Sequence, residues 1–406
     1  MIRNEHEKYY FCSLFLSEFA RTLPHAVLTI ILINKGLALG NIAMVQMCYM
    51  LAIMIFEFPS GVISDIFDRK IVYLMSIFLS MVSYFIIFKA TSFAILCSAW
   101  FIYGMSSAVS TGTIDISFNR LYQGDSKQLK AFISSRKIIL SIGAILGGYI
   151  GNILFLHIDL KIYLISLLLY LVSSLVTILF ISCDKNTDYQ YKKEDTMLYL
   201  LNFKKDITRF LRSEVLLELF ILISAIQFFF QPFYLYWQVI FTDKNIPISS
   251  FGTMYILFRL SDIIGAWIFK KIKRPEYSIY IILATMALLS ILIKTVSHIY
   301  MFTTIITLLV TVVSLYSNNL EYFLRKNIDS KVLGTITSIN STISRLFSFL
   351  VLLICSVLSN LMSAINTLVL LVLIFCTLSA IVTYKFKAKK RAIKLQTSLS
   401  KQINPE

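Results

Sequence analysis

The chain of 406 residues has little charge and little proline for its length. Only 15% of its residues are charged, 22 of them are acidic, and only six residues are proline. Hydrophobic residues make up 57% of the chain, and its mean hydropathy is +0.77. A water-soluble protein of this length would carry more charge. The composition therefore predicts a protein that lies in a membrane.

The chain also lacks the common motifs of nucleotide hydrolysis, metal binding and hydrolytic catalysis. It contains no GxxxxGK[ST] phosphate loop, no HExxH pair and no closely spaced Ser, His and Asp set. Its four histidines (His6, His25, His157 and His298) lie on different segments, and its cysteines show no metal-site spacing. We expect no enzyme activity, no metal and no cofactor.

Apolar stretches long enough to cross a bilayer recur along the chain. A spanning helix needs about 20 consecutive apolar residues. Breaks at charged residues, glycines and prolines separate twelve such stretches. The predicted spans are 9–33, 41–64, 71–91, 94–117, 137–157, 161–182, 215–240, 249–270, 277–297, 299–320, 334–358 and 362–384.

The basic residues are distributed unevenly over the connections between these spans. Alternate connections and the termini hold 30 of the 38 Lys and Arg residues, the other connections hold five, and three lie within spans. Because cytoplasmic loops are enriched in Lys and Arg, both termini are predicted to be cytoplasmic. The net charge of +16 is therefore a topology signal, and we expect no nucleic-acid partner.

The predicted organisation is all-α, with two six-helix bundles in a membrane. Residues 1–182 form the N-terminal bundle, and residues 214–385 form the C-terminal bundle. Residues 183–213 are predicted to be a cytoplasmic linker with an amphipathic helix, and residues 386–406 a basic cytoplasmic tail. The frequent Ile, Lys, Phe, Tyr and Asn suggest an AT-rich bacterial genome, so we expect a multi-pass protein of a bacterial cell membrane.

The connection after the second span carries a specific motif. Residues 57–70 read EFPSGVISDIFDRK, which resembles the signature loop of the major facilitator superfamily. The matching residues are Gly61, Asp65, Arg69 and Lys70. Asp68 replaces the second glycine of the family pattern.

This resemblance implies a transporter with twelve helices that works by alternating access. It implies that Asp65 caps the eleventh span in one state, where the positive end of the helix dipole favours an acid. It also implies that Asp115, at the cytoplasmic end of the fourth span, holds Arg69, and Arg136 could complete the cluster. The alternative is a group of solvated loop charges.

The predicted fifth span reads SIGAILGGYIGN and contains four glycines: Gly143, Gly147, Gly148 and Gly151. It resembles the glycine motif of antiporter branches of the superfamily, although Gly148 and Asn152 replace its usual proline and last glycine. The resemblance favours efflux. The alternative is ordinary close packing of membrane helices through glycines four residues apart.

Charged residues within the spans are candidates for proton coupling, because a charge in a membrane is costly and must be paired or functional. Glu18 and Arg21 lie three residues apart in the first span, followed by His25, and Pro24 is expected to bend the helix between them. Arg259 and Asp262 repeat the spacing in the eighth span. The alternative for each pair is a static ion pair.

Polar stripes on the spans that line the central cavity in this family are candidates for substrate contacts. Their spacings of three and four residues place each stripe on one helical face. The candidates are Tyr103, Ser107 and Ser110 in the fourth span, Gln227, Gln231, Tyr234, Trp237 and Gln238 in the seventh, and Thr307, Thr311 and Asn318 in the tenth. The alternative for a Ser or Thr is a hydrogen bond to a carbonyl of its own helix.

These observations together predict a proton-coupled exporter of a small molecule that acts as a monomer in the bilayer. An importer with the same fold is the nearest alternative. A polytopic membrane enzyme or a receptor that does not transport is the alternative from another class.

The signature loop generates a test. Asp65→Asn should lower transport by about tenfold or more, because the neutral side chain loses its charge–dipole interaction, while the amount of protein in the membrane stays unchanged. Transport is compared with wild type at equal protein in membrane vesicles. Unchanged transport would exclude a gating role for Asp65.

Overall fold

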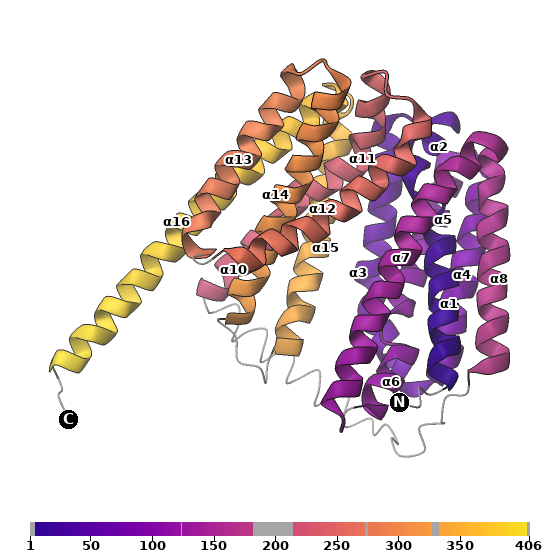
Figure 1. Cartoon of the computed structure of the whole chain (residues 1–406), viewed down its shortest axis with the longest axis horizontal. Helices are drawn as coiled ribbons and strands as arrows, with labels where there is room; N and C mark the ends of the chain where they lie inside the picture. The colour runs from indigo at the N-terminus through magenta and orange to yellow at the C-terminus, as the bar shows by residue number, and fades with distance from the viewer. Residues whose placement is uncertain (1–4, 123, 182–213, 273–274, 327–332, 404–406) are drawn as a thin grey trace. The chain divides into compact units, whose positions relative to one another are not determined.

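The structure, a computed structural model, describes residues 5–122, 124–181, 214–272, 275–326 and 333–403, and it is built from helices (Figure 1). No β-strand occurs within these ranges. The predicted all-α class is therefore confirmed. The predicted linker, residues 183–213, lies outside the described residues.

The described chain divides into two compact units, and each is treated by itself. The first unit takes in the described parts of Met1–Lys192, Leu235–Arg259 and Leu352–Ala364. The second takes in the described parts of Lys193–Tyr234, Leu260–Val351 and Ile365–Glu406. Two segments from the second half of the sequence therefore pack with the first half.

The first unit contains α1 (Glu5–Thr22), η1 (His25–Val27), α2 (Leu28–Asn34), α3 (Leu39–Ile66), α4 (Arg69–Lys89), α5 (Phe93–Ser110), α6 (Ile114–Leu121), α7 (Ser126–Ile158), η2 (Asp159–Lys161) and α8 (Ile162–Phe180). It also includes the end of α11 (Gln227–Asp243), η3 (Ile248–Ser250) and the first part of α12 (Phe251–Lys271). The second unit contains α10 (Glu214–Ala225), α13 (Pro275–Thr295), α14 (Ile299–Lys326), most of α15 (Leu333–Leu358) and nearly all of α16 (Ala364–Ile403), with the remaining parts of α11 and α12.

Eleven segments of the described chain are long and apolar enough to cross a membrane, so this is a multi-pass membrane protein. One of them, Ser126–Phe180, has 55 residues and holds both the fifth and the sixth predicted span. Within it the chain turns at η2, where Asp159 has a φ of 49°. The exact number of twelve spans and the orientation of the termini stay predictions.

Helix α8 shows how the first unit is ordered for a membrane. Most of its hydroxyl-bearing residues are buried and a row of its leucines is exposed, which is the reverse of a soluble helix. The buried set is Ser166, Tyr170, Ser173 and Thr177, and the exposed set is Leu164, Leu168, Leu171, Leu175 and Leu179. Lipid can cover the apolar side, whereas the hydroxyls must find partners inside the bundle.

A chain of buried hydroxyls joins α8 to α1 and α4. Ser13 Oγ lies 2.8 Å from both Ser173 Oγ and Thr177 Oγ1, and Ser17 Oγ lies 2.7 Å from Ser173 Oγ. Tyr73 Oη of α4 lies 3.2 Å from Ser13 Oγ. Because lipid tails offer no hydrogen bonds, these contacts hold the three helices in register.

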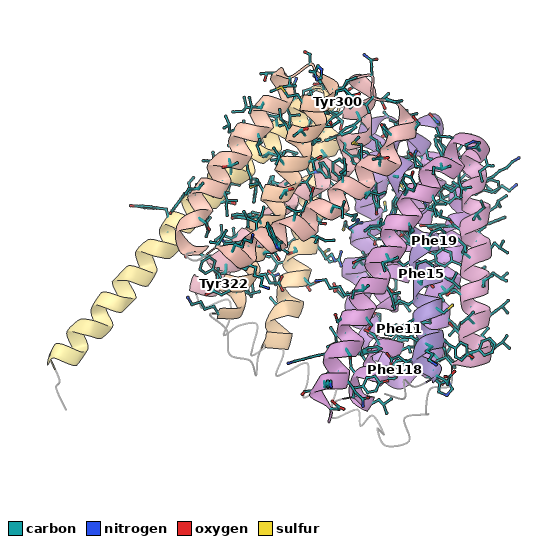
Figure 2. The ribbon with its side chains drawn as sticks, in the orientation of Figure 1. Phe11, Phe15, Phe19, Phe118, Tyr300 and Tyr322 are labelled. Atoms are coloured by element: carbon teal, nitrogen blue, oxygen red, sulfur yellow. The ribbon has the colours of Figure 1, made fainter. Side chains whose placement is uncertain are left out.

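Aromatic rings follow the same unit along α1. Figure 2 shows Phe19, Phe15, Phe11 and Phe118 one after another along the first unit. The rings of Phe15 and Phe19 stack at 5.8 Å, and Phe11 stacks on Phe132 of α7 at 5.5 Å. Ring contacts thus pack one face of α1 against α7.

Glycines allow α7 to approach α1 closely. A Cβ added at Gly143 would lie 3.3 Å from the Glu18 side chain, and one at Gly147 would lie 2.8 Å from the Phe19 carbonyl oxygen. A Cβ at Gly151 would collide with the Leu23 carbonyl. Close packing therefore requires glycine at this helix pair, which agrees with the packing alternative for the motif.

Three predicted spans are interrupted. The first breaks at η1, directly after Pro24, as expected. The predicted fourth span continues to residue 117, but α5 ends at Ser110, and Gly112 adopts a φ of +74° that favours glycine. In the seventh span the predicted interruption is at Pro232. This proline lies inside α11 instead, and the interruption falls at Ile226.

Acidic side chains begin two of the helices. Asp68, which replaces the family glycine, accepts a 2.8 Å hydrogen bond from Lys70 N and caps α4. Asp125 caps α7 and accepts hydrogen bonds from Gln128 N and Lys127 N, which lower the pKa of its carboxyl group. The turn before α4 is therefore stabilised by a side chain in place of a glycine.

The packing of α7 on the first span generates a test of stability. Gly151→Ala should lower the unfolding temperature of the purified protein, because a methyl group collides with the Leu23 carbonyl, and overpacking costs about 1–3 kcal/mol. Gly124→Ala is the matched control, since nothing lies within 4 Å of the added atom. Equal unfolding temperatures for the two variants would contradict the close approach.

Candidate functional site

A polar cavity of about 330 Å³ lies inside the first unit. Residues of α1, α4, α5, α7 and α8, together with Thr113 before α6, form its wall, so it is built wholly from the first half of the chain. The lining residues are Tyr10, Leu14, Ser17, Glu18, Arg21, Tyr73, Ser76, Ile77, Ser80, Tyr103, Ser106, Ser107, Ser110, Thr113, Arg136, Leu140 and Tyr170. Eleven of these seventeen residues carry a hydroxyl group.

Glu18 and Arg21 form a bidentate ion pair at the cavity wall. Arg21 Nε donates to Glu18 Oε2 at 2.9 Å, and Arg21 Nη2 donates to Glu18 Oε1 at 2.5 Å. The i, i+3 spacing on α1 places the two side chains on one face. Tyr84 Oη donates to the Arg21 carbonyl at 2.7 Å and anchors the same turn. The pair is therefore well coordinated and neutral as a unit.

Arg136 and Asp115 form a looser pair at another part of the wall. Arg136 Nη2 lies 3.6 Å from Asp115 Oδ2, beyond normal hydrogen-bond length. The Arg136 side chain is 38% exposed, and its Nε has no hydrogen-bond partner among the described residues. The structure thus brings together these two predicted residues, which come from α6 and α7.

Most serine and threonine hydroxyls of the wall already donate a hydrogen bond to another group of the protein. Ser76 Oγ donates to the Tyr73 carbonyl at 2.7 Å, and Ser106 Oγ donates to the Ser76 carbonyl at 2.7 Å. Ser110 Oγ donates to the Ser107 carbonyl at 2.8 Å. Each of these oxygens keeps lone pairs, so it offers an acceptor to the cavity.

Tyr103 is only 5% exposed and stands among the rings of Tyr49, Tyr84 and Trp100. The Tyr84 hydroxyl and the Arg21 guanidinium lie near its hydroxyl group. No atom of the described chain lies at hydrogen-bond distance and angle from it. A buried hydroxyl without a partner is costly, by about 1–3 kcal/mol.

The signature-loop residues lie at the junction of α3 and α4. Gly61 and Asp65 belong to the last turns of α3, and the Asp65 side chain is outside what the structure describes. Arg69 begins α4 and is 4% exposed, and Lys70 Nζ donates to the Ile178 carbonyl at 3.0 Å. The predicted contact of Asp65 with the eleventh span stays a prediction.

The remaining charged candidates do not line the cavity. His25 lies in η1, beyond the break in the first span. Arg259 of α12 donates to Tyr255 Oη at 2.8 Å and lies over that ring at 5.1 Å. Asp262 accepts a hydrogen bond from Ser314 Oγ through its backbone carbonyl. A coupling role for these three residues stays a prediction.

Gln238, a predicted cavity residue, forms hydrogen bonds to the backbone at the break in the first span. A substrate role for it stays a prediction. Its Oε1 accepts hydrogen bonds from Thr29 N at 2.8 Å and Ile30 N at 3.2 Å. Its Nε2 donates to the His25 carbonyl at 3.1 Å, and its side chain is 1% exposed. The broken first span thus receives hydrogen bonds from a side chain of α11, within the first unit.

Asn152, which replaces the last glycine of the motif in α7, makes a similar link within the first unit. Its Nδ2 donates to the Ile248 carbonyl at 2.9 Å, and its Oδ1 accepts from Gly252 N at 2.7 Å. The ring of Tyr255 covers Gly148. The departures from the family motif therefore coincide with contacts between α7 and the start of α12.

The other seventh-span candidates divide between the two units. Trp237 is buried in a first-unit cluster, where its ring packs against those of Phe241, Phe251 and Phe258. In the second unit, Gln231 Nε2 donates to Gln227 Oε1 at 2.9 Å and to Ser348 Oγ at 3.2 Å. Tyr234 is 45% exposed, whereas Gln231 is buried. A substrate role for these residues stays a prediction.

The tenth-span stripe hydrogen-bonds within its own helix, α14. Thr307 Oγ1 donates to the Thr303 carbonyl, Thr311 Oγ1 to the Thr307 carbonyl and Asn318 Nδ2 to the Ser314 carbonyl, at 2.7–2.9 Å. These contacts match the backbone-bonding alternative. A substrate role for the three residues stays a prediction.

Helix α4 contributes to the cavity, and the family resemblance does not predict this contribution. Tyr73, Ser76 and Ser80 line the cavity, and with Ser83 they follow spacings of 3, 4 and 3. The same stripe signal marks the candidate residues of other spans. The third span is not among those that line the cavity in the family, so only the spacing could have indicated it.

No group of residues in the described ranges is arranged to hold a metal.

Comparison with known proteins identifies one family. The family model described as Major Facilitator Superfamily matches residues 10–352, which is most of the chain. No curated protein matches the sequence.

Solved transporter structures share the fold at low sequence identity. The nucleoside transporter NupG aligns with a TM-score of 0.73 at 14% identity, over 95% of this chain and 99% of that one. A bacterial homologue of the iron transporter ferroportin aligns with a TM-score of 0.73 at 15% identity, over 94% and 98%. A bacterial homologue of the human lysosomal transporter Spinster aligns with a TM-score of 0.72 at 11% identity, over 96% and 98%. At these identities the likeness shows the fold alone.

The Gln238 contacts generate a test with a cysteine probe. In a variant without the six native cysteines, Thr29→Cys should react slowly with a membrane-impermeant maleimide, because Thr29 is 1% exposed. Adding Gln238→Leu should speed the reaction by about tenfold or more, since it removes three hydrogen bonds of about 1 kcal/mol each. Gln227→Leu is the matched control and should leave the rate unchanged. Equal rates with both leucine variants would show that Gln238 does not close this region.

Proposed function

Because the chain belongs to the major facilitator superfamily, we propose that it moves a small solute across the membrane by secondary active transport. The observation that carries this proposal is the hydroxyl-rich cavity with three charged side chains inside a bundle of apolar helices. A polar cavity in a membrane costs free energy, because each unsatisfied polar group loses its hydration. Such a cavity is therefore expected to have a function.

Interruptions in three spans support an alternating-access mechanism. Discontinuous helices are typical of secondary transporters and place backbone groups and side chains at the site. The breaks at Pro24 and Gly112 lie in chain segments that directly adjoin cavity residues Arg21 and Thr113. We propose that the contacts of Gln238 and Asn152 close one side of the pathway and break when that side opens.

Efflux coupled to protons is the proposed direction and energy source. Glu18 is a carboxylate in the cavity wall, held by an arginine that a proton on Glu18 would release. The glycines of α7 support efflux through their resemblance to the antiporter motif. Their packing against α1 would couple a movement of Glu18 to α7, because a Cβ added at Gly143 would lie 3.3 Å from that side chain.

A mixture of solutes allows transport to be tested in both directions. Everted and right-side-out vesicles that contain the protein are incubated with a bacterial metabolite extract under an imposed pH gradient. Their contents are then compared by mass spectrometry with vesicles that lack it. An exporter should concentrate at least one solute in everted, acid-loaded vesicles, and Glu18→Gln should lower that accumulation by about tenfold or more.

The variants and vesicle types separate the alternatives. Lys137→Gln, an exposed position on α7, is the control and should transport as wild type. Accumulation confined to right-side-out vesicles would indicate an importer, and a chemically altered solute would indicate an enzyme. Full accumulation by Glu18→Gln would remove this residue from coupling, and no accumulation in either vesicle type would overturn the transport proposal.

A further inference from the structure

The charged residues in the cavity wall leave one cation weakly paired. Glu18 and Arg21 neutralise each other through two hydrogen bonds. Among the described carboxylates, Arg136 contacts only Asp115, at 3.6 Å, and its side chain is 38% exposed. The Tyr10 hydroxyl lies near the same guanidinium and carries no charge to offset it. A ligand therefore meets a wall with one incompletely neutralised guanidinium.

A guanidinium of this kind selects for an oxyanion. Its planar N–H groups match the two oxygens of a carboxylate or phosphate, and charge-assisted hydrogen bonds are about twice as strong as neutral ones. A cationic ligand would pair most strongly with a free carboxylate, but Glu18, which lines the cavity, already accepts two hydrogen bonds from Arg21. The charge arrangement disfavours cations.

The hydroxyls of the wall select for hydroxyl groups on the ligand. Ser76, Ser106 and Ser110 already donate their protons to backbone carbonyls, and Ser80 Oγ lies 2.6 Å from Ser106 Oγ. Their free lone pairs can accept hydrogen bonds but their protons are engaged. A ligand that brings several O–H donors complements this wall.

The volume of the cavity and the unbonded hydroxyl of Tyr103 narrow the class of ligand further. A volume of about 330 Å³ is at the lower end for ligand pockets, which suits a molecule the size of one sugar. The Tyr103 hydroxyl has no hydrogen-bond partner in the described chain, and a ligand oxygen would supply an acceptor for it.

We infer that the cavity of the first unit binds a small hydroxylated oxyanion, a sugar acid or a sugar phosphate, through Arg136 and the cavity hydroxyls. This assignment rests on the proposed transport function, because it names the class of solute that would be carried. The carboxylate and phosphate sources share one chemistry, and the experiment separates them.

Four probes of similar size and different charge test the inference. D-glucuronate, D-glucose 6-phosphate, D-glucose and D-glucosamine are added to the purified full-length protein, and thermal unfolding is followed by intrinsic fluorescence. At least one anionic probe should raise the unfolding temperature by about 2 °C or more at saturation. Its apparent dissociation constant should be at least about tenfold lower than those of glucose and glucosamine. Stabilisation by glucuronate alone, by the phosphate alone or by both identifies the oxyanion.

Variants of matched charge locate the site. Arg136→Gln should raise the dissociation constant of the anionic probe by about tenfold or more, whereas Lys137→Gln, the adjacent exposed cation, should leave it unchanged. Tyr103→Phe covers the case in which Arg136→Gln does not fold. It should raise the unfolding temperature without ligand, because it removes a buried hydroxyl that lacks a partner, and it should weaken binding of the anionic probe.

Several results would overturn the inference. These are equal or stronger stabilisation by glucose or glucosamine, no stabilisation by any probe at millimolar concentration, or equal effects of Arg136→Gln and Lys137→Gln. The vesicle experiment keeps the two proposals apart. Solute accumulation without anion binding would refute the ligand class alone, whereas Arg136-dependent anion binding without accumulation would refute transport and leave the binding site standing.

Discussion

The cost of an unsatisfied polar group in a membrane governs this structure. Lipid tails accept no hydrogen bonds, so each hydroxyl, amide and charge within a span must find a partner inside the bundle. The result is visible in α8, where serine, threonine and tyrosine face inward and leucines face outward. The hydroxyl chain of Ser13, Ser173 and Thr177 and the pair of Glu18 with Arg21 satisfy the same requirement. Polar contacts thus take over much of the role that hydrophobic burial has in soluble proteins.

This constraint explains why the helix breaks carry side-chain partners. An interruption frees backbone N–H and carbonyl groups at membrane depth, and such groups must be bonded again. Gln238 supplies this at the break in the first span by accepting from two backbone amides and donating to one carbonyl. Because Gln238 belongs to α11, the stability of the hydrogen bonds at this break depends on the position of α11. This is a physical basis for coupling gate movement to the site.

At the cavity wall this constraint is incompletely met. Arg136 has a single long contact with Asp115 as its described ion pair, and the Tyr103 hydroxyl has no hydrogen-bond partner among the described residues. Other groups of the same wall are well bonded, as Glu18 and Ser106 show. Incomplete pairing at a cavity wall is expected of a site that a ligand completes. The same groups set the charge and the hydrogen-bonding character of the solute that would fit.

The amino-acid sequence alone establishes the membrane environment, the all-helical class and the family, because hydropathy, helix periodicity and the loop at residues 57–70 are local properties. It also locates the pair of Glu18 and Arg21, since i, i+3 spacing places two side chains on one helical face. Which polar stripes meet depends on tertiary packing. Packing brings Arg136 of α7 to Asp115 of α6, turns Tyr73 and Ser76 of α4 into the cavity, and gives Gln238 a role in closing a helix break. Those contacts depend on how each helix is rotated against its neighbours. Close approach at residues such as Gly147 and Gly151 fixes that rotation. The hydropathy of the sequence does not predict it.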